Sequence, residues 1–349
     1  MIQFPNDFVI IPFILTFLVT ALITPGCIVL SKKIGLIDDP KRHKHPALLH
    51  TRPIPRGGGL PLLLSVFLVG IFFLPINQTT IAVFAAALLA LIVGLVDDRL
   101  NAKSKDVSPY LRFFLNIVVA IIVVANGVSI QFITNPFGGI LHIPVIISFI
   151  ISVVWLIWIM NMLNWSKGVD GQMPGIVAIS AIVIGILSLR GTGEFIDAKL
   201  AFIIAGSALG FLLFNFHPAK LFPGYGATAL YLLLGVTSML SSAKLATALL
   251  VMGVPLVDFV FTILRRVIQK KSPFKGDKKH LHHLLLQLGW SQRQIALFYW
   301  GISAILGVLA LSLESKSKVF AIIMVGVITG GGLFFLHAVT KKTNEKSIS

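Results

Sequence analysis

Long apolar stretches separated by short polar ones form the main pattern along this chain. A helix that crosses a bilayer needs about 20 mostly apolar residues, and eleven stretches meet or approach that length. The pattern predicts an all-α polytopic membrane protein with ten or eleven transmembrane helices, the first a retained anchor rather than a signal peptide. The eleven predicted spans are 8–30, 59–76, 79–96, 113–127, 145–163, 175–189, 199–214, 226–241, 244–264, 295–313 and 318–338.

Composition excludes a water-soluble globule, because 56% of the 349 residues are apolar and only 12% are charged. The mean hydropathy of +0.93 also excludes a soluble nucleic-acid binder, although the net charge is +16. The expected partners of that charge are anionic: phospholipid headgroups of the bilayer, or a phosphorylated substrate at its surface. The single cysteine, Cys27, leaves no disulfide to form.

The basic residues predict the orientation, because Lys and Arg in short loops are retained on the cytoplasmic side. Eleven spans with the N-terminus outside place all but five of the 29 Lys and Arg residues inside. The chemistry-bearing loops then face the cytoplasm, and the protein is a multi-pass protein of the cell membrane. We predict one membrane-embedded domain over 1–340, a polar cytoplasmic tail over 341–349 and a small outer hairpin within 128–144. The five outer basic residues are Arg190, Lys199, Lys244, Lys316 and Lys318.

A pair of carboxylates, Asp97 and Asp98, ends the third predicted span on the inner side. Adjacent acids repel each other unless a cation or a shared proton lies between them. A solvated helix end is the structural alternative, but two acids leaving an apolar run favour function. Mg²⁺ prefers hard oxygen ligands and binds one or two carboxylates together with substrate phosphates. One acid of the pair is then expected to bind metal and the other to act as a base.

Two further segments bring polar groups to the inner side. Asn161 and Asn164 share a face of the fifth span, and Asp170 follows in a glycine-marked loop where backbone can approach a ligand, although Gly168 also suits a plain helix C-cap. Asp258 lies within the ninth span, where an acid must be paired, protonated or in a polar cavity. We interpret Asp258 as support for the site rather than as a reacting group.

The last large inner loop contains His280, His282 and His283. Three imidazoles are compatible with zinc, but no cysteine accompanies them and nearby lysines oppose a cation. Phosphate binding fits better, while a solvated basic loop explains only the lysines. Two more inner loops are basic and marked by glycine or proline, one with Arg56 before Gly57 and the other with Lys220. Backbone N–H groups of such loops can surround a phosphate.

Together these motifs, in this order and on one side, resemble the polyprenyl-phosphate N-acetylhexosamine-1-phosphate transferases, which belong to glycosyltransferase family 4. The resemblance covers nearly the whole chain, and the histidine pattern is more similar to the N-acetylglucosamine branch than to the phospho-N-acetylmuramoyl-pentapeptide branch. The resemblance implies transfer of a sugar 1-phosphate, expected to be N-acetylglucosamine 1-phosphate, from a UDP-N-acetylhexosamine to undecaprenyl phosphate. UMP is released, and the product would start a cell-envelope glycan.

The resemblance also implies roles for individual residues. Asp97 and Asp98 would be catalytic, with Asp97 deprotonating or positioning the lipid phosphate, and Asp98 and Asn164 around Mg²⁺, or alternatively Mn²⁺. Phosphoryl transfer consists mostly of positioning and charge neutralisation, so acids, metal and basic loops are the parts it requires. The implied substrate-binding residues are Arg56, Arg112, Asn161, Asp170, Lys220, His280, His282 and His283.

The sequence departs from the family pattern at two positions. Lys167 stands where relatives have an acid after the paired asparagines, and Tyr225 stands where the family has a principal metal ligand. A phenol with an ordinary pKa of about 10 is no substitute for a carboxylate.

An active transferase with an altered metal shell is therefore predicted, with a relative that binds polyprenyl phosphate or nucleotide sugar without turnover as the alternative. An ion-coupled transporter is disfavoured because its acids would lie near the bilayer midplane. Family members are often homodimers, so the resemblance allows a homodimer, and the sequence leaves the oligomeric state open.

Overall fold

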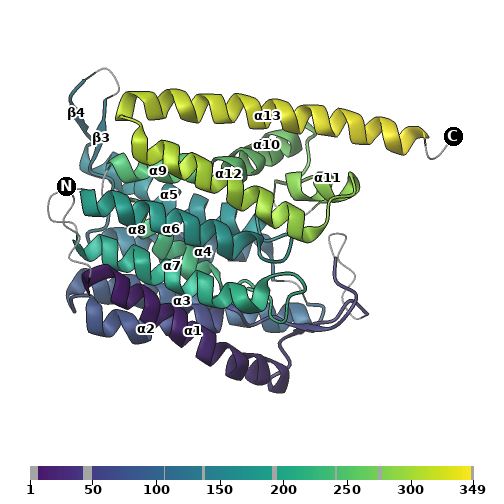
Figure 1. Ribbon diagram of the computed structural model, residues 1–349, viewed down its shortest axis with the longest axis horizontal. Coiled ribbons are helices and arrows are strands. Elements are labelled where there is room, and N and C mark those ends of the chain that lie inside the picture. Colours follow the sequence, from purple (N-terminus) through teal and green to yellow (C-terminus); the bar gives the residue numbers. More distant parts are fainter. Residues whose placement is uncertain are drawn as a thin grey trace.

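The computed structural model describes residues 7–41, 49–105, 107–135, 138–190, 195–239, 242–273 and 277–346. Over these ranges it contains thirteen helices and two short two-stranded hairpins. The helices run side by side between two ends of the molecule (Figure 1). The structure is therefore that of an all-helical, polytopic membrane protein, as the apolar pattern predicts.

Seven described helices are long and apolar enough to cross a membrane unaided. They are α1 (Asp7–Lys33), α3 (Gln78–Ala102), α5 (Val145–Trp165), α6 (Gln172–Arg190), α7 (Phe195–Asn215), α12 (Gln292–Ser312) and α13 (Ser315–Lys346). Three apolar helices are shorter, namely α2 (Gly59–Phe73), α4 (Pro109–Ala125) and α8 (Thr228–Met239). Each of the predicted spans coincides with one of these helices or with the α9–α10 pair. By length and composition, however, seven or eight of them qualify as membrane spans.

The ninth predicted span is not one straight helix. It consists of α9 (Ser242–Val251) and α10 (Gly253–Ile268), which meet at a bend of 80°. Pro255 lacks the N–H that would bond the carbonyl of Val251, so the helix cannot continue regularly through this point. The expectation of a continuous span over 244–264 is therefore corrected to a broken one.

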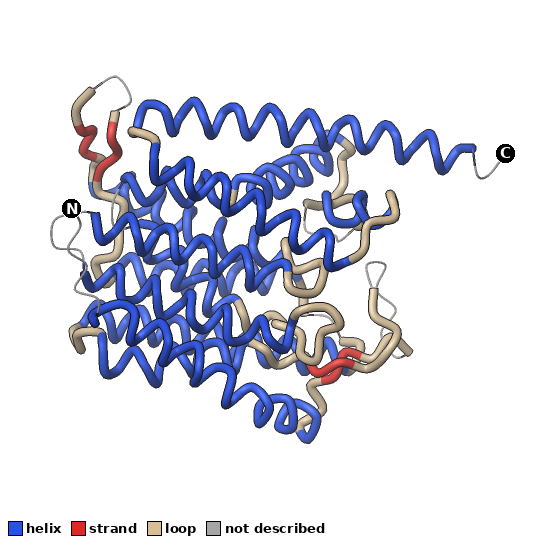
Figure 2. Tube along the Cα trace, in the orientation of Figure 1, coloured by secondary structure: helices blue, strands red, loops and turns tan. Residues whose placement is uncertain are grey.

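The loops hold the remaining elements. Strand β3 (Phe132–Thr134) pairs antiparallel with β4 (Ile140–His142), which confirms the hairpin predicted within 128–144. Strand β1 (Ile37–Asp38) pairs with β2 (Ile54–Pro55), and the short helix α11 (Leu281–Gln287) follows α10; the sequence pattern predicts neither. Figure 2 shows the two hairpins at opposite ends of the bundle. Helix α13 continues through Lys346, into the segment predicted as a polar tail, of which 347–349 lie outside the described residues.

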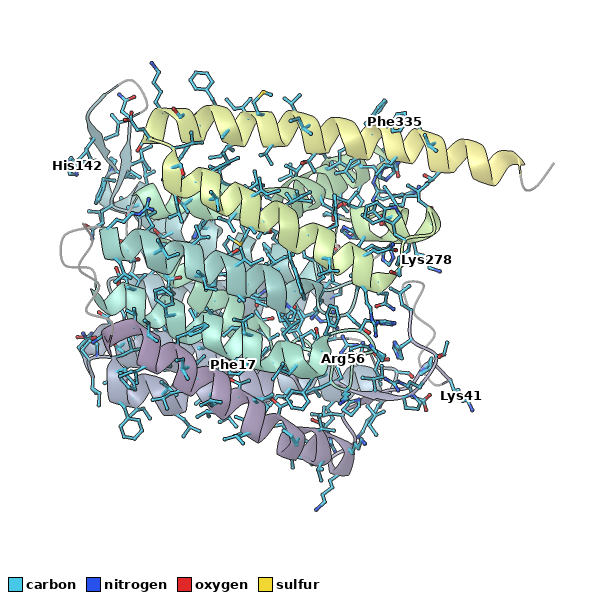
Figure 3. The ribbon with its side chains drawn as sticks, viewed as in Figure 1. Phe17, Lys41, Arg56, His142, Lys278 and Phe335 are labelled. Atoms are coloured by element: carbon cyan, nitrogen blue, oxygen red, sulfur yellow. The ribbon has the colours of Figure 1, made fainter. Side chains whose placement is uncertain are left out.

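The loops predicted to carry the chemistry gather at one end of the bundle. Lys41, Arg56 and Lys278 lie at this end, whereas His142 of the other hairpin lies at the opposite end (Figure 3). We call the end with Arg56 the polar end. Its loops come from five separate parts of the sequence, so the helix packing brings the motifs together.

Helices α1 and α7 lie unusually close to each other. A Cβ atom placed on Gly206 would be 2.3 Å from the carbonyl oxygen of Phe13, and one on Gly210 would be 2.5 Å from that of Phe17. Two glycines four residues apart let two helix backbones approach, as is common between membrane helices. This contact fixes α1, and with it the segment that leads to β1 at the polar end.

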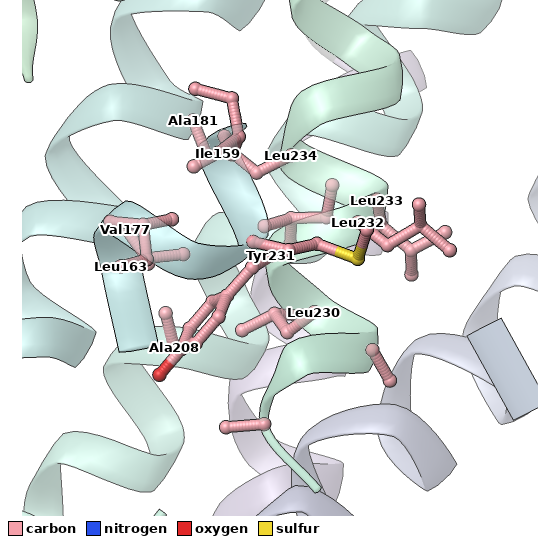
Figure 4. Packing of buried hydrophobic residues seen from close by; sticks show 14 of the residues in the cluster. Ile159, Leu163, Val177, Ala181, Ala208, Leu230, Tyr231, Leu232, Leu233 and Leu234 are labelled. Atoms are coloured by element: carbon pink, nitrogen blue, oxygen red, sulfur yellow. The ribbon is translucent and has the colours of Figure 1, made fainter. Parts of the chain in front are cut away.

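Helix α8 lies at the centre of the core, and all twelve of its residues are buried. A helix that is apolar on all sides is surrounded by other helices. Figure 4 shows Tyr231 and its α8 neighbours against Ile159 of α5, Val177 of α6 and Ala208 of α7. Because α8 is held on every side, the loop that immediately precedes it is held rigidly at the polar end.

Candidate active site

The adjacent acids at the end of α3 are buried, and each has its own arginine. Asp97 Oδ1 accepts a hydrogen bond from Arg112 Nε at 2.6 Å, and Asp98 Oδ1 accepts one from Arg56 Nε at 3.0 Å. Asp97 is 2% exposed and Asp98 is fully buried. Two separate arginines therefore supply the positive charge that two neighbouring carboxylates require.

Arg56 also binds the first hairpin. Its Nη1 donates to Asp38 Oδ2 and to Asn101 Oδ1, both at 2.9 Å. Its backbone N–H bonds the carbonyl of Leu36, next to the β1–β2 ladder. The guanidinium predicted to bind substrate is thus held by two acids and an amide, and the sequence analysis assigned no role to Asp38 or Asn101. Asn101 lies four residues after Asp97, on the same helix face, which is the one signal that points to it.

The loop before α8 wraps around Asp98. The backbone N–H of Tyr225 lies 2.8 and 2.9 Å from the two carboxylate oxygens, and that of Gly226 lies 3.2 Å from Oδ2. Gly224 has a φ of +64°, and a Cβ there would lie 2.2 Å from Asp98 Oδ2. Only glycine fits this position. The glycine-rich loop therefore surrounds a carboxylate of the protein itself.

Lys167 lies between the end of α5 and this loop. Its Nζ donates to Asn164 Oδ1 at 2.8 Å and to the carbonyl oxygen of Gly224 at 2.6 Å. Asn164 in turn donates from Nδ2 to Thr228 Oγ1 at 2.7 Å. Burial, and then the nearby charge of Arg56, lowers the pKa of Lys167 to about 7, although the acids oppose this shift.

The side chain of Tyr225 lies between two cations. Its ring centre is 5.3 Å from Arg112 Cζ and 5.6 Å from Lys167 Nζ, at distances typical of cation–π contacts. Its hydroxyl accepts a hydrogen bond from Asn116 Nδ2 at 3.2 Å. Burial raises the pKa of Tyr225 to about 12, so the phenol is neutral near pH 7. Asn116, four residues after Arg112 on α4, was not predicted.

The expected Mg²⁺ ligands do not form an open set. Both oxygens of Asp98 accept hydrogen bonds from arginine or backbone donors, and Asn164 Oδ1 is bonded to the Lys167 ammonium. Within the described ranges, no three His, Cys, Asp or Glu side chains are placed to hold a metal ion. This arrangement does not fit a divalent cation bound by Asp98 and Asn164, because Arg56, Lys167 and backbone N–H groups already lie against the oxygens that would bind it.

One acid oxygen of the cluster is available. Among the residues that the structure describes, Asp97 Oδ2 is buried and has no hydrogen-bond partner. It lies on the same carboxylate that Arg112 holds by Oδ1. A buried carboxylate oxygen without a partner has lone pairs free to accept a proton from a substrate, and the cations beside it favour an anionic substrate.

The three histidines lie together on and before α11. Asp258 Oδ2 is 2.9 Å from His280 Nδ1, and its Oδ1 accepts from the N–H of Leu281, so this acid is paired and holds the histidine segment; its supporting role in the site stays a prediction. The rings of His282 and His283 are 4.2 Å apart, and Nδ1 of His282 lacks a partner among the described side chains. Burial, then repulsion from the neighbouring imidazoles, lowers the pKa of His283 to about 4 and that of His282 well below its usual value. Both are neutral at pH 7, so they offer hydrogen bonds rather than positive charge.

The histidines contact the loop after α5. A Cβ atom on Gly168 would lie 1.8 Å from Nε2 of His282, so this glycine is required by close approach. The basic loop that leads to α11 is partly neutralised, because Asp277 Oδ2 lies 2.8 Å from Arg265 Nη2 and 3.2 Å from Arg266 Nε. Despite burial, hydrogen bonds from these arginines lower the pKa of Asp277 to about 2.

Asp170 joins its own loop to the loop before α8 and to the start of α12. Its Oδ2 lies 2.8 Å from His217 Nδ1 and accepts from the N–H of Ala219 at 3.0 Å, while its own N–H donates to Gln292 Oε1 at 3.0 Å. These partners were not predicted. Through these hydrogen bonds Asp170 connects separate segments of the polar end, in addition to its predicted contact with the nucleotide.

Two predicted substrate residues lie apart from the acid cluster. Asn161 is half-buried on α5 and donates to the carbonyl of Ile157 on its own helix, without sharing a contact with Asn164. Lys220 is exposed in the loop that contains Asp170's partner Ala219. The structure thus brings nine of the twelve predicted site residues into two clusters, the acids with their cations and Asn164, and the histidines with Asp258. The loop from 166 to 171, which contains Asp170, joins the two clusters.

The acids, the asparagine–lysine pair and the tyrosine loop lie within residues 80–242, which match the model of glycosyl transferase family 4. The chain is 29% identical to the "Probable undecaprenyl-phosphate N-acetylglucosaminyl 1-phosphate transferase" of Bacillus subtilis, over 97% of this chain and 94% of that relative. It is 31% identical to the decaprenyl-phosphate N-acetylglucosaminephosphotransferase of Mycobacterium leprae, over 82% and 78% of the two chains. It is 28% identical to the phospho-N-acetylmuramoyl-pentapeptide-transferase of Borreliella afzelii, over 86% and 93%.

These matches extend over the polar end and most of the helical bundle, and they confirm the resemblance carried by the motifs. The chain belongs to glycosyl transferase family 4, in the branch of polyprenyl-phosphate N-acetylhexosamine-1-phosphate transferases.

Proposed function

We propose that this protein transfers N-acetylhexosamine 1-phosphate from a UDP-sugar to undecaprenyl phosphate and releases UMP. The observation that carries the proposal is the unpartnered Oδ2 of Asp97, buried in a cluster whose other acid oxygens are occupied. The family supports the reaction class. The names of the Bacillus and Mycobacterium relatives, together with the histidine pattern, favour N-acetylglucosamine as the sugar.

The proposed step joins two phosphates. An oxygen of the lipid phosphate attacks the β-phosphorus of the UDP-sugar, and the bond from this phosphorus to the bridging oxygen breaks. The electron pair of that bond leaves on UMP. Asp97 Oδ2 accepts the proton of a monoprotonated lipid phosphate, or positions the dianion when no proton is present. The product is a polyprenyl diphosphate that carries the sugar, which would begin a cell-envelope glycan.

The neighbouring residues provide position and charge. Arg112 orients Asp97 through Oδ1 and presents its remaining guanidinium donors to phosphate oxygens. Asp98 has no free oxygen, so it acts as a positioning residue that holds the loop from 224 to 226. Phosphoryl transfer requires mainly such positioning and neutralisation. Mg²⁺, which the family resemblance predicts, would supply further neutralisation if it arrived with the substrate phosphates rather than bound by Asp98 and Asn164.

The remaining predicted contacts concern the nucleotide sugar. His282 and His283 are neutral and buried beside Gly168, so they are placed to hydrogen-bond a phosphate or a sugar hydroxyl. Asp170 is predicted to contact the nucleotide through the carboxylate oxygen that His217 does not occupy. The substrate contacts of Lys220 and Asn161, which lie apart from the acid cluster, stay predictions.

An apolar cavity of about 250 Å³ beside the acids supports a polyprenyl substrate. Its lining includes Ile34 of the segment after α1, Leu60 of α2 and Leu95 of α3, with Arg99 also in the lining. Gly57 and Arg99 are the chain neighbours of Arg56 and Asp98, so the cavity adjoins the acid cluster. An isoprenoid chain would remove this apolar surface from water.

The orientation of the protein follows from its basic residues. Twenty-four of the 29 Lys and Arg residues belong to segments that the eleven-span topology places inside. We propose that the polar end faces the cytoplasm, that the N-terminus is outside and that the chain lies in the bacterial cytoplasmic membrane. A homodimer is a further prediction, tested by the mass of the purified protein in detergent.

A second function is favoured by two specific residues. Lys167 and Tyr225 occupy positions where family members have acids, and this favours a protein that binds polyprenyl phosphate or nucleotide sugar without turnover. The two functions differ in whether UMP is formed.

The test is UMP release by the purified protein from UDP-N-acetylglucosamine and undecaprenyl phosphate, with and without Mg²⁺. UDP-N-acetylgalactosamine and UDP-N-acetylmuramoyl-pentapeptide serve as alternative donors. We expect UMP and a lipid-linked sugar phosphate in stoichiometric amounts. If no donor gives UMP, and calorimetry nevertheless detects saturable binding of a UDP-sugar, the second function replaces the first.

A further inference from the structure

The Lys167 ammonium lies between two oxygen atoms of the kinds that commonly bind cations. Its ammonium contacts Asn164 Oδ1 and the carbonyl oxygen of Gly224, from two different segments of the chain. Amide and backbone carbonyl oxygens are ordinary ligands of hard metal cations, but they are equally good acceptors for an ammonium. A metal ion that bound these two oxygens would lie close to the positive charge of the ammonium already between them.

The charges around Lys167 balance below pH 7, where its amine is protonated. The acids of this cluster are Asp38, Asp97 and Asp98, and its cations are then Arg56, Arg112 and Lys167. A divalent ion added between Asp98 and Asn164 would approach three positive groups without an uncompensated acid to receive it. Like charges at such distances disfavour binding strongly when the site is buried.

Tyr225 closes the same position from the other side. Its ring lies against both Lys167 and Arg112, and its hydroxyl is held by Asn116. The two departures from the family pattern are therefore in direct contact with each other. Tyr225 replaces an anionic ligand by a neutral ring, and Lys167 introduces a cation. A ring face attracts an ammonium.

We propose that the ammonium of Lys167 takes the place of a protein-bound divalent cation in this chain, with Tyr225 as the neutral surface against which it packs. The inference rests on the proposed function for its catalytic consequence. An ammonium has three donors, and two of them hold Asn164 and Gly224. The third is directed to substrate: it binds an oxygen of the diphosphate and neutralises charge as the bond to UMP breaks.

Manganese binding tests the inference without turnover. The full-length protein in detergent is titrated with Mn²⁺ alone, and free Mn²⁺ is followed by its electron paramagnetic resonance signal. We expect no Mn²⁺ binding to the wild type that depends on Asp98, so Asp98→Asn should leave the titration curve unchanged. The double variant Lys167→Asp, Tyr225→Asp restores two acids and should bind Mn²⁺ at least about 10- to 100-fold more tightly, the size of effect that even outer-shell groups have on metal affinity.

Controls keep this titration decisive. Lys316→Asp makes the same charge change as Lys167→Asp alone at an exposed residue of α13, and it should leave Mn²⁺ binding as in the wild type. The wild-type titration stands even if the double variant does not fold. Tight binding of Mn²⁺ to the wild type that Mg²⁺ displaces and Asp98→Asn abolishes would overturn the inference.

Activity provides the second measurement. If UMP release occurs, we expect it to persist when a chelator removes divalent ions. Lys167→Met should lower kcat by about 10²- to 10³-fold, the usual cost of one preorganised charge-stabilising donor. Loss of UMP release in chelator, restored by Mg²⁺, would contradict the inference. Absence of turnover with every donor would instead contradict the proposed function, and the Mn²⁺ titration would still decide the cation question.

Discussion

Arg112 and Asp97 lie 2.6 Å apart, between Nε and Oδ1, across the junction of α3 and α4. Asp97 is almost completely buried, whereas a quarter of the Arg112 side chain is exposed. The pair therefore links the interior of the bundle to the surface of the polar end. It neutralises one acid oxygen and leaves the other, Oδ2, without a partner among the described residues.

Breaking this pair from the arginine side should destabilise the fold. Arg112→Met leaves a buried carboxylate without its cation, and removal of one partner of a buried pair costs about 3–5 kcal/mol in free energy of unfolding. The partial exposure of Arg112 places the expected loss at the lower end. Urea unfolding in detergent micelles measures it. The double variant Asp97→Asn, Arg112→Met should recover part of the loss, and strictly additive losses would contradict the pairing.

The base role predicts a selective effect on rate. Asp97→Asn keeps the shape of the side chain but removes its basicity, so kcat for UMP release should fall by about 10²- to 10⁴-fold. The KM for the UDP-sugar should change little, because Asp97 is assigned to the lipid phosphate. Glu314→Gln, an exposed acid between α12 and α13, is the matched control. An Asp97→Asn protein with the wild-type rate would remove Asp97 from the mechanism.

Gly224 offers a sharper test of the loop around Asp98. Gly224→Ala forces a side chain into a φ of +64° and against Asp98 Oδ2, whereas a Cβ on Gly226 has no atom closer than 3.3 Å. A non-glycine residue in such a conformation costs about 1–3 kcal/mol. We expect Gly224→Ala to lower both thermal stability and UMP release, and Gly226→Ala to affect them much less. Equal effects would show that the loop does not depend on this close approach.

The sequence predicts the helices and the residues of the site better than it predicts their contacts. Apolar length marks each helix except α11, and the acid pair Asp97 and Asp98 is recognisable because adjacent charges that end an apolar span usually have a function. The 80° bend between α9 and α10 was missed, because a proline such as Pro255 is tolerated in many straight membrane helices. Whether it breaks a helix depends on packing around it.

The contacts that define the site involve groups with no sequence signature. Lys167 binds the backbone carbonyl of Gly224, and Asp98 is surrounded by backbone N–H groups of Tyr225 and Gly226. Every residue has such groups, so no pattern of letters distinguishes these. The sequence identifies Lys167 and Tyr225 as departures from the family, but only the fold shows that they touch each other.

The histidine segment should open in acid. The pKa of His283 is about 4 in the folded protein, below the ordinary value of 6.5, and that of His282 is also lowered, so the folded state binds fewer protons than the unfolded one. Stability from these groups is complete above pH 6.5 and falls as pH drops from 6.5 toward 4, by about 1.4 kcal/mol per pH unit for each group. Hydrogen exchange of residues 281–287 should accelerate between pH 7 and 5, after correction for intrinsic rates.

A matched variant separates this effect from general acid unfolding. His282→Gln, His283→Gln removes both titrating groups, and its α11 exchange should lose most of the added pH dependence. Exchange in α8, whose residues are buried on every side, provides the internal reference. Equal acceleration in α8 and α11 of the wild type would contradict a local effect of the histidines.

A residue that lines the apolar cavity should affect the KM for the lipid substrate and not the KM for the nucleotide sugar. Leu95 lines the cavity, so Leu95→Trp fills part of it and should raise the KM for undecaprenyl phosphate by about 10-fold or more, the scale of hydrophobic-pocket discrimination. The KM for the UDP-sugar should stay unchanged.

Leu88→Trp is the control, because Leu88 lies two turns earlier on α3, is 44% exposed and is outside the cavity lining. Steady-state rates with undecaprenyl phosphate and a short-chain prenyl phosphate measure the effect. A short chain that does not reach Leu95 should be used equally well by both variants, and an equal rise in KM for both lipids would place the isoprenoid elsewhere.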